Sequence, residues 1–124
     1  MSSGKVMNTG GLEITVTHDA DGALVCLKGR LGLDSSPALR DRLLAILQGP
    51  PPEPVIVDLT GVPYIEGSGI ATLLEALRVA RNHKTTLRLR GLHDRLLHLF
   101  QVTGVLSLFE SYGCTNTQPI VKAL

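Results

Sequence analysis

The spacing of hydrophobic residues predicts four short strands. Apolar and polar side chains alternate over residues 12–17, as in a strand with one buried face. The turn sequence at 19–22, Asp-Ala-Asp-Gly, separates this strand from a second at 23–31, so the two are expected to form a hairpin. Residues 54–59 are nearly all apolar and rich in β-branched side chains, which favours a buried central strand, and residues 85–90 alternate again.

Between these strands, apolar residues recur every three or four positions, which predicts amphipathic helices. The first helix begins near Pro37, and the side-chain oxygens of Asp34, Ser35 and Ser36 can cap it. Its apolar stripe ends at Leu47, before Gly49 and three prolines. Two more helices are predicted over 70–80 and 92–100, a short strand or helical turn over 105–109, and a last helix from about Pro119.

The order of these elements predicts an α/β domain. Two strands come first, and single helices then separate the later strands, which requires crossovers and therefore parallel pairs in the sheet. We expect residues 1–11 to be a flexible N-terminal lead-in, because they are small, polar and glycine-rich. Residues 12–124 are expected to form one domain.

Composition excludes several classes of function. The chain has 124 residues, of which 44% are hydrophobic and 19% charged, which is typical of a globular domain. A net charge of +1 and an aromatic content of 3% argue against direct nucleic-acid binding. No apolar run is long enough for a membrane span, and the first ten residues resemble no secretory signal. The two cysteines lie far apart, so we expect a cytoplasmic protein without disulfides.

Catalytic and metal sites are not expected. The histidines show neither the i, i+4 spacing nor the carboxylate partners of a metal site: His18, His83, His93 and His98. A hydrolase nucleophile of the Gly-x-Ser-x-Gly type has a glycine two residues before the serine and another two residues after it. At these positions Ser68 has Glu66 and Ile70. No glycine-rich phosphate loop is present. The sequence therefore predicts a binding protein with no cofactor.

Residues 78–95 carry half of the lysines and arginines in the chain, six of twelve. Arginines on the outward face of an edge strand discourage unwanted pairing with other strands, and this is our interpretation of Arg88 and Arg90. Recognition of an acidic partner surface is the alternative.

The start of the second predicted helix is the most informative position. Gly67 and Gly69 leave the backbone uncovered there, and Ser68 is expected to cap the helix with its hydroxyl. Free N–H groups and a partial positive charge at a helix N-terminus suit a phosphate or a partner's carboxylate.

Residues 12–112, which include this helix start, resemble the STAS domains of bacterial anti-sigma factor antagonists. The resemblance rests on Gly29-Arg30-Leu31, on Val57-Asp58-Leu59-Thr60-Gly61-Val62-Pro63-Tyr64-Ile65, on Ser68-Gly69-Ile70-Ala71-Thr72-Leu73-Leu74, on Gly91-Leu92, and on Leu99-Phe100-Gln101-Val102-Thr103-Gly104-Val105. It implies the STAS fold, a mixed β-sheet of about four to five strands with α-helices packed mainly on one face.

The resemblance implies a regulator of transcription that binds an anti-sigma factor with a serine-kinase fold and is controlled by phosphorylation at the start of the second helix. This chain departs from the pattern twice. Gly67 stands at the usual phosphoacceptor position, and Gly32 replaces a frequent aspartate, although Asp34 is nearby. We therefore expect the phosphorylation switch to be absent; its displacement to Ser68 is the alternative.

We expect the partner to bind at the helix start and at the loop after the second predicted strand. The residues concerned are Glu66, Gly67, Ser68, Gly69, Gly32, Asp34 and Ser35. A second hypothesis is an accessory STAS subunit that binds the ATPase of a membrane lipid ABC transporter, and a third is a small-molecule or nucleotide sensor. The apolar segment 120–124 suggests a weak homodimer.

Overall fold

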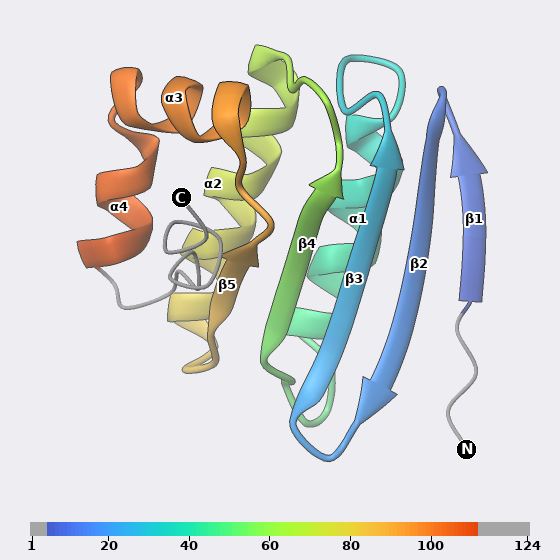
Figure 1. Ribbon diagram of the computed structural model, residues 1–124. Helices are drawn as coiled ribbons and strands as arrows, with labels where there is room; N and C mark the ends of the chain where they lie inside the picture. Colours follow the sequence, from blue (N-terminus) through green and yellow to red (C-terminus); the bar gives the residue numbers. More distant parts are fainter. Residues whose placement is uncertain (1–4, 112–124) are drawn as a thin grey trace.

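The computed structural model describes residues 5–111 (Figure 1). Its elements are, in chain order, β1 (Lys5–Thr9), β2 (Leu12–Asp19), β3 (Gly22–Gly29), α1 (Ser36–Leu47), β4 (Val55–Gly61), α2 (Gly67–Asn82), β5 (Leu87–Arg90), α3 (Asp94–Val102) and α4 (Val105–Ser111). Within these residues, no helix has both the length and the apolar character needed to cross a bilayer. The helix predicted from Pro119 and the apolar segment 120–124 lie outside the described residues.

The sheet is mixed, and its five strands follow the order of the chain, β1-β2-β3-β4-β5. The pairs β1–β2 and β2–β3 are antiparallel, whereas β3–β4 and β4–β5 are parallel. Helices α1 and α2 both lie behind the sheet, which confirms the prediction of helices mainly on one face (Figure 1). The crossovers through these helices are what make the later strands parallel.

Strand β1 lies within residues 1–11, the segment expected to be a flexible N-terminal lead-in. Residues Lys5–Thr9 pair with β2, with Thr9 opposite Leu12, across a two-residue turn of Gly10 and Gly11. Both glycines have positive φ, +55° and +84°, as this tight hairpin turn requires. The Gly-Gly pair was the available signal for a hairpin here.

The core lies between the sheet and its helices. Alternate residues of β2, β3, β4 and β5 face it, and Ile14, Val25, Val57 and Leu89 are each fully buried. The segment whose secondary structure the sequence left open is helix α4. Its buried residues Val105 and Phe109 are four apart, the spacing of one helix face.

The edge position of β5 is confirmed, and so is the outward orientation of its arginines. Leu87 and Leu89 are buried, whereas Arg88 is exposed on the other face. Arg90 lies beside the neighbouring strand, where its Nε donates to Asp58 Oδ2 at 3.1 Å. The open face of the sheet is therefore polar at this edge.

Gly91 sets the turn that follows β5. It has a φ of +81°, and a Cβ there would lie 2.6 Å from the Thr60 nitrogen and 2.7 Å from Asp58 Oδ1. We predict that Gly91→Ala lowers the free energy of unfolding by about 2–4 kcal/mol, through backbone strain and this collision. Gly104→Ala is the matched control, because Gly104 has a φ of +79° but open space around it. This variant should lose about 1 kcal/mol of the free energy of unfolding, through backbone strain alone. Equal losses in urea denaturation would contradict the collision.

Asp58 predicts a specific pH dependence of stability. Burial raises the pKa of Asp58, but hydrogen bonds from Thr60 and Arg90 outweigh it and hold that pKa below its ordinary value of 3.8. The ionised Asp58 carboxylate therefore contributes fully to the free energy of unfolding above about pH 4. This contribution is lost as the pH falls through the lowered pKa of Asp58 in the folded protein. Asp58→Asn should destabilise the protein by about 1 kcal/mol at pH 7, and the difference should shrink below pH 4.

The pH dependence is measured by urea denaturation between pH 2.5 and 7. The control is Asp41→Asn, because the Asp41 side chain is 79% exposed. A gap between wild type and Asp58→Asn that stays constant down to pH 2.5 would contradict the ionic role of Asp58.

Candidate functional site

Two loops meet at one end of the sheet. Strands β3 and β4 are parallel, with Val25 opposite Val57, so their carboxyl ends lie at the same end of the sheet. The first loop, residues 30–35, leads from β3 into α1, and the second loop, residues 62–66, leads from β4 into α2. Both loops lie at the end of the molecule where α2 begins (Figure 1). Carboxyl ends of parallel strands are the usual place for binding sites in α/β sheets.

The two loops are joined by backbone contacts. Leu31 and Ile65 form an isolated parallel bridge, and the Glu66 amide donates to the Leu31 carbonyl at 3.0 Å. Gly69 is buried against this bridge, and a Cβ there would lie 2.7 Å from Ile65 Cγ1 and 2.8 Å from Leu31 Cγ. Glycine is thus required at position 69 because the first turn of α2 packs directly on both loops.

Two serine hydroxyls shape the first loop. Ser35 Oγ donates to the Arg30 carbonyl at 2.8 Å and accepts from the Gly32 amide at 3.1 Å. Ser36 Oγ donates to the Gly32 carbonyl at 2.6 Å. Ser35 is the N-cap residue of α1, but its side chain makes no capping bond there, because these loop contacts engage it. It is fully buried, so it supports the loop from within.

The start of α2 corrects the expectation that Ser68 caps it. The N-cap residue is Glu66, in an extended conformation, and its carbonyl accepts from the Gly69 and Ile70 amides at 2.9 and 3.1 Å. The helix starts one residue before Ser68 because the bridge between the loops fixes Glu66 as the last extended residue. Ser68 Oγ is buried and has no hydrogen-bond partner among the described residues.

Gly67 is the most open position of this helix start. It is exposed, and a Cβ built on it would meet no atom within 4 Å. Of the residues expected to contact a partner, the structure exposes Glu66, Gly67 and Asp34 and buries Gly32, Ser35 and Gly69. We call Glu66 and Gly67 the α2 tip.

The Glu66 side chain connects the α2 tip to the first loop. Its Oε1 accepts from the Leu33 amide at 3.2 Å. The carboxylate lies over Gly32, where a Cβ would be 2.6 Å from Glu66 Cδ. Glycine at position 32 therefore makes room for this carboxylate. Together these residues border a hollow of about 230 Å³, lined by Gly10, Arg30, Gly32, Leu33, Asp34 and Glu66.

Two exposed apolar side chains lie on the two loops of this site, and the hydrophobic pattern predicted neither of them. Leu33 is 75% exposed in the first loop, and Tyr64 is 56% exposed in the second. Leu33 stands between Gly32 and Asp34, outside any periodic pattern. That isolation was the available signal, since a large apolar residue in a polar loop has no place in a core stripe.

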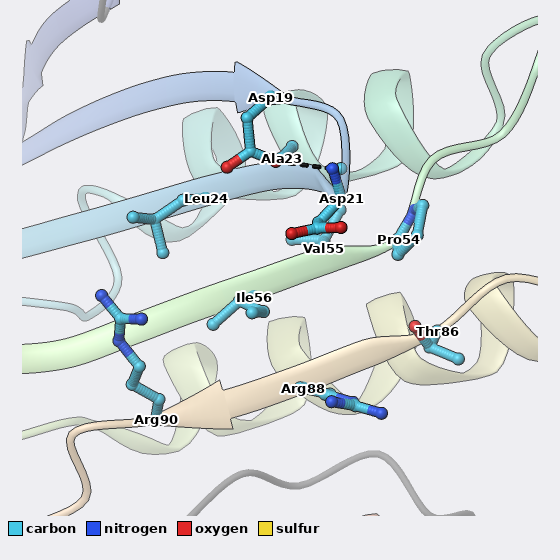
Figure 2. Close-up of a pocket in the computed structure, with 11 residues that line it drawn as sticks. Asp19, Asp21, Ala23, Leu24, Pro54, Val55, Ile56, Thr86, Arg88 and Arg90 are labelled. Carbon is cyan, nitrogen blue, oxygen red and sulfur yellow. Dashed lines mark hydrogen bonds between the residues drawn. The ribbon is translucent and has the colours of Figure 1, made fainter.

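A larger hollow of about 560 Å³ lies on the open face of the sheet. Asp21, Leu24, Ile56 and Arg88 are among the residues that line it (Figure 2). It involves the beginning of β4, whereas the α2 tip follows the end of β4, so the two places are at opposite ends of this strand. Within residues 5–111, no three side chains of the metal-binding types come together.

Comparison with known proteins gives the family. The family model described as "Mlab, STAS domain" matches residues 14–110. The anti-sigma-B factor antagonist of Bacillus subtilis is 23% identical over 100 residues, which cover 80% of this chain and 89% of that protein. The anti-sigma-B factor antagonist of Listeria monocytogenes is 37% identical over 54 residues, 44% of this chain. That match spans 47% of the relative, about half of its length.

Solved structures agree on the fold. An anti-sigma-factor antagonist STAS-domain protein from Planctomyces limnophilus superposes with a TM-score of 0.70, at 22% identity, over 89% of this chain and 96% of that one. The anti-sigma factor antagonist SpoIIAA in its unphosphorylated form gives 0.58, at 16% identity, over 80% and 82%. With the family model covering residues 14–110 and the five-stranded mixed sheet in place, this chain belongs to the STAS-domain family.

Proposed function

We propose that this chain is an anti-sigma factor antagonist that acts by binding, and that it docks a serine-kinase-type anti-sigma factor through the α2 tip without control by phosphorylation. The observation that carries this is Gly67, an exposed residue at the first position of α2 that has no hydroxyl. The names of the relatives in Bacillus subtilis and Listeria monocytogenes support the class of partner.

Phosphorylation at the α2 tip would oppose docking for a simple electrostatic reason. A phosphate adds about −1.5 to −2 charges, and here it would follow directly after the exposed carboxylate of Glu66. Glycine at position 67 offers no acceptor, and the neighbouring hydroxyl of Ser68 is buried. The chain would therefore stay in its binding-competent form whether or not the partner holds ATP.

A second candidate rests on the family model, which takes its name from Mlab and not from an anti-sigma factor antagonist. In this candidate the same tip binds the ATPase of a membrane lipid ABC transporter, as an accessory STAS subunit. Binding to purified representatives of both partner classes separates the two candidates.

We predict a one-to-one complex with the cognate anti-sigma factor, with the same Kd with and without ATP. Isothermal titration calorimetry measures the Kd, and mass spectrometry after incubation with ATP tests for modification. A phosphopeptide that contains Ser68, or a complex that ATP dissolves, would contradict constitutive binding. Ser68→Ala should leave the Kd unchanged, because the hydroxyl it removes is buried.

We also predict that a side chain at position 67 restores control. Gly67→Ser should fold normally, since the site is open, and should become phosphorylated by the kinase-type partner. Gly67→Asp should weaken binding at least tenfold, by adding charge at the tip. Gly67→Ala is the control for the added Cβ and should bind within about twofold of wild type. Equal binding by Gly67→Asp and Gly67→Ala would show that the tip is not the docking surface.

A further inference from the structure

We propose that Tyr64 and Leu33 are the two apolar anchors of the docking surface, and that Glu66 is the positioning residue that holds Leu33 in place. The partner that fits is a protein surface with two apolar recesses and at least one lysine or arginine beside them. This inference rests on the proposed function, since it specifies how the α2 tip is recognised.

The argument for the anchors begins with exposure. Five large hydrophobic residues of the described chain are prominently exposed, and two of them, Leu33 and Tyr64, lie on the two loops of the site. Neither belongs to the buried core. The Leu33 amide donates to Glu66, and Tyr64 lies on the second loop two residues before Glu66, so a partner seated on the α2 tip would meet both loops. Tyrosine is enriched among residues that dominate binding energy, whereas leucine is not, so Tyr64 is the stronger anchor.

The second step concerns how Leu33 is held. Its loop is fixed from the inside by Ser35 and Ser36, whose hydroxyls bond to the backbone of Arg30 and Gly32. From the outside, the Leu33 amide donates to Glu66 Oε1 at 3.2 Å. The same carboxylate lies over Gly32, next to Leu33. Because the Leu33 side chain is itself 75% exposed, packing does little to hold this residue, and the hydrogen bond from its backbone amide to Glu66 fixes its place in the loop.

Charge defines the partner's chemistry further. Glu66 and Asp34 are exposed carboxylates at this hollow, and Arg30 is the one guanidinium that lines it. Two negative groups against one positive group leave the rim acidic. A basic side chain on the partner would complement it, and such contacts at a rim affect association and specificity more than affinity. We therefore expect Tyr64 and Leu33 to provide most of the affinity for the partner. The carboxylates of Glu66 and Asp34 should make that affinity depend on salt concentration.

The anchors are tested by calorimetry with the anti-sigma factor. Tyr64→Ala should weaken the Kd about 30-fold or more, and Leu33→Ala about tenfold. Leu108→Ala is the matched control, because Leu108 is also exposed, at 43%, but lies on α4, beyond β5 (Figure 1). It should bind within about twofold of wild type. Unfolding in urea, followed for all three variants, separates lost contacts from lost folding.

The positioning role is tested without a partner. Glu66→Ala should raise the hydrogen-exchange rate of the Leu33 amide about tenfold, whereas Glu66→Gln, whose amide oxygen can still accept, should change it little. In the complex, Glu66→Gln should reduce the salt dependence of the Kd, and Glu66→Ala should weaken the Kd further. An unchanged exchange rate in Glu66→Ala would overturn the positioning role.

The outcomes distinguish this inference from the function on which it rests. If wild type binds and Gly67→Asp does not, but Tyr64→Ala and Leu33→Ala bind like wild type, the anchors are wrong and the proposed function stands. If wild type fails to bind the anti-sigma factor, the proposed function is wrong, and so are the anchors for that partner. Loss of affinity in Leu108→Ala equal to that in Tyr64→Ala would also overturn the anchors.

Discussion

The parallel pairing of β3 with β4 is the constraint on which the site depends. It sends the chain out of both strands at one edge, and the bridge between Leu31 and Ile65 continues that pairing into the two loops. The Glu66 amide adds one more bond to the Leu31 carbonyl, and α2 begins at the next residue. The α2 tip therefore extends the sheet, and backbone hydrogen bonds hold it in position.

Glycines at this end of the molecule serve two distinct purposes. Gly69 and Gly32 allow close approach, one of α2 to the loops and the other of the Glu66 carboxylate to the first loop. Gly67 allows nothing of the kind, because the space around it is empty. Steric need therefore explains the first two and leaves the third without a structural reason, which is why we connect Gly67 to function.

The sequence predicted most of the fold, because buried strands and helices leave strong periodic patterns. It missed β1, where the pairing depends on a Gly-Gly turn and on β2 and the segment itself is short and polar. It also misplaced the helix cap at Ser68, because the start of α2 is fixed by a contact with Leu31, more than thirty residues away. Leu33 and Tyr64 escaped notice for a related reason: exposure is a property of the folded surface and has no period along the chain.

The absence of an accessible hydroxyl at the first two positions of α2 changes what can regulate the proposed docking. With a phosphoacceptor, added charge would switch the surface itself. Under the proposed function, with Gly67 exposed and the Ser68 hydroxyl buried, the docking surface would gain no phosphate, and the fraction of protein bound would follow the concentrations of the two partners and any change of state in the partner. Affinity carried by apolar side chains suits this arrangement, since it depends less on ionic strength than affinity carried by ion pairs. In this proposal, control would lie in the amounts of the two proteins and in the state of the partner, and not in a modification of the α2 tip.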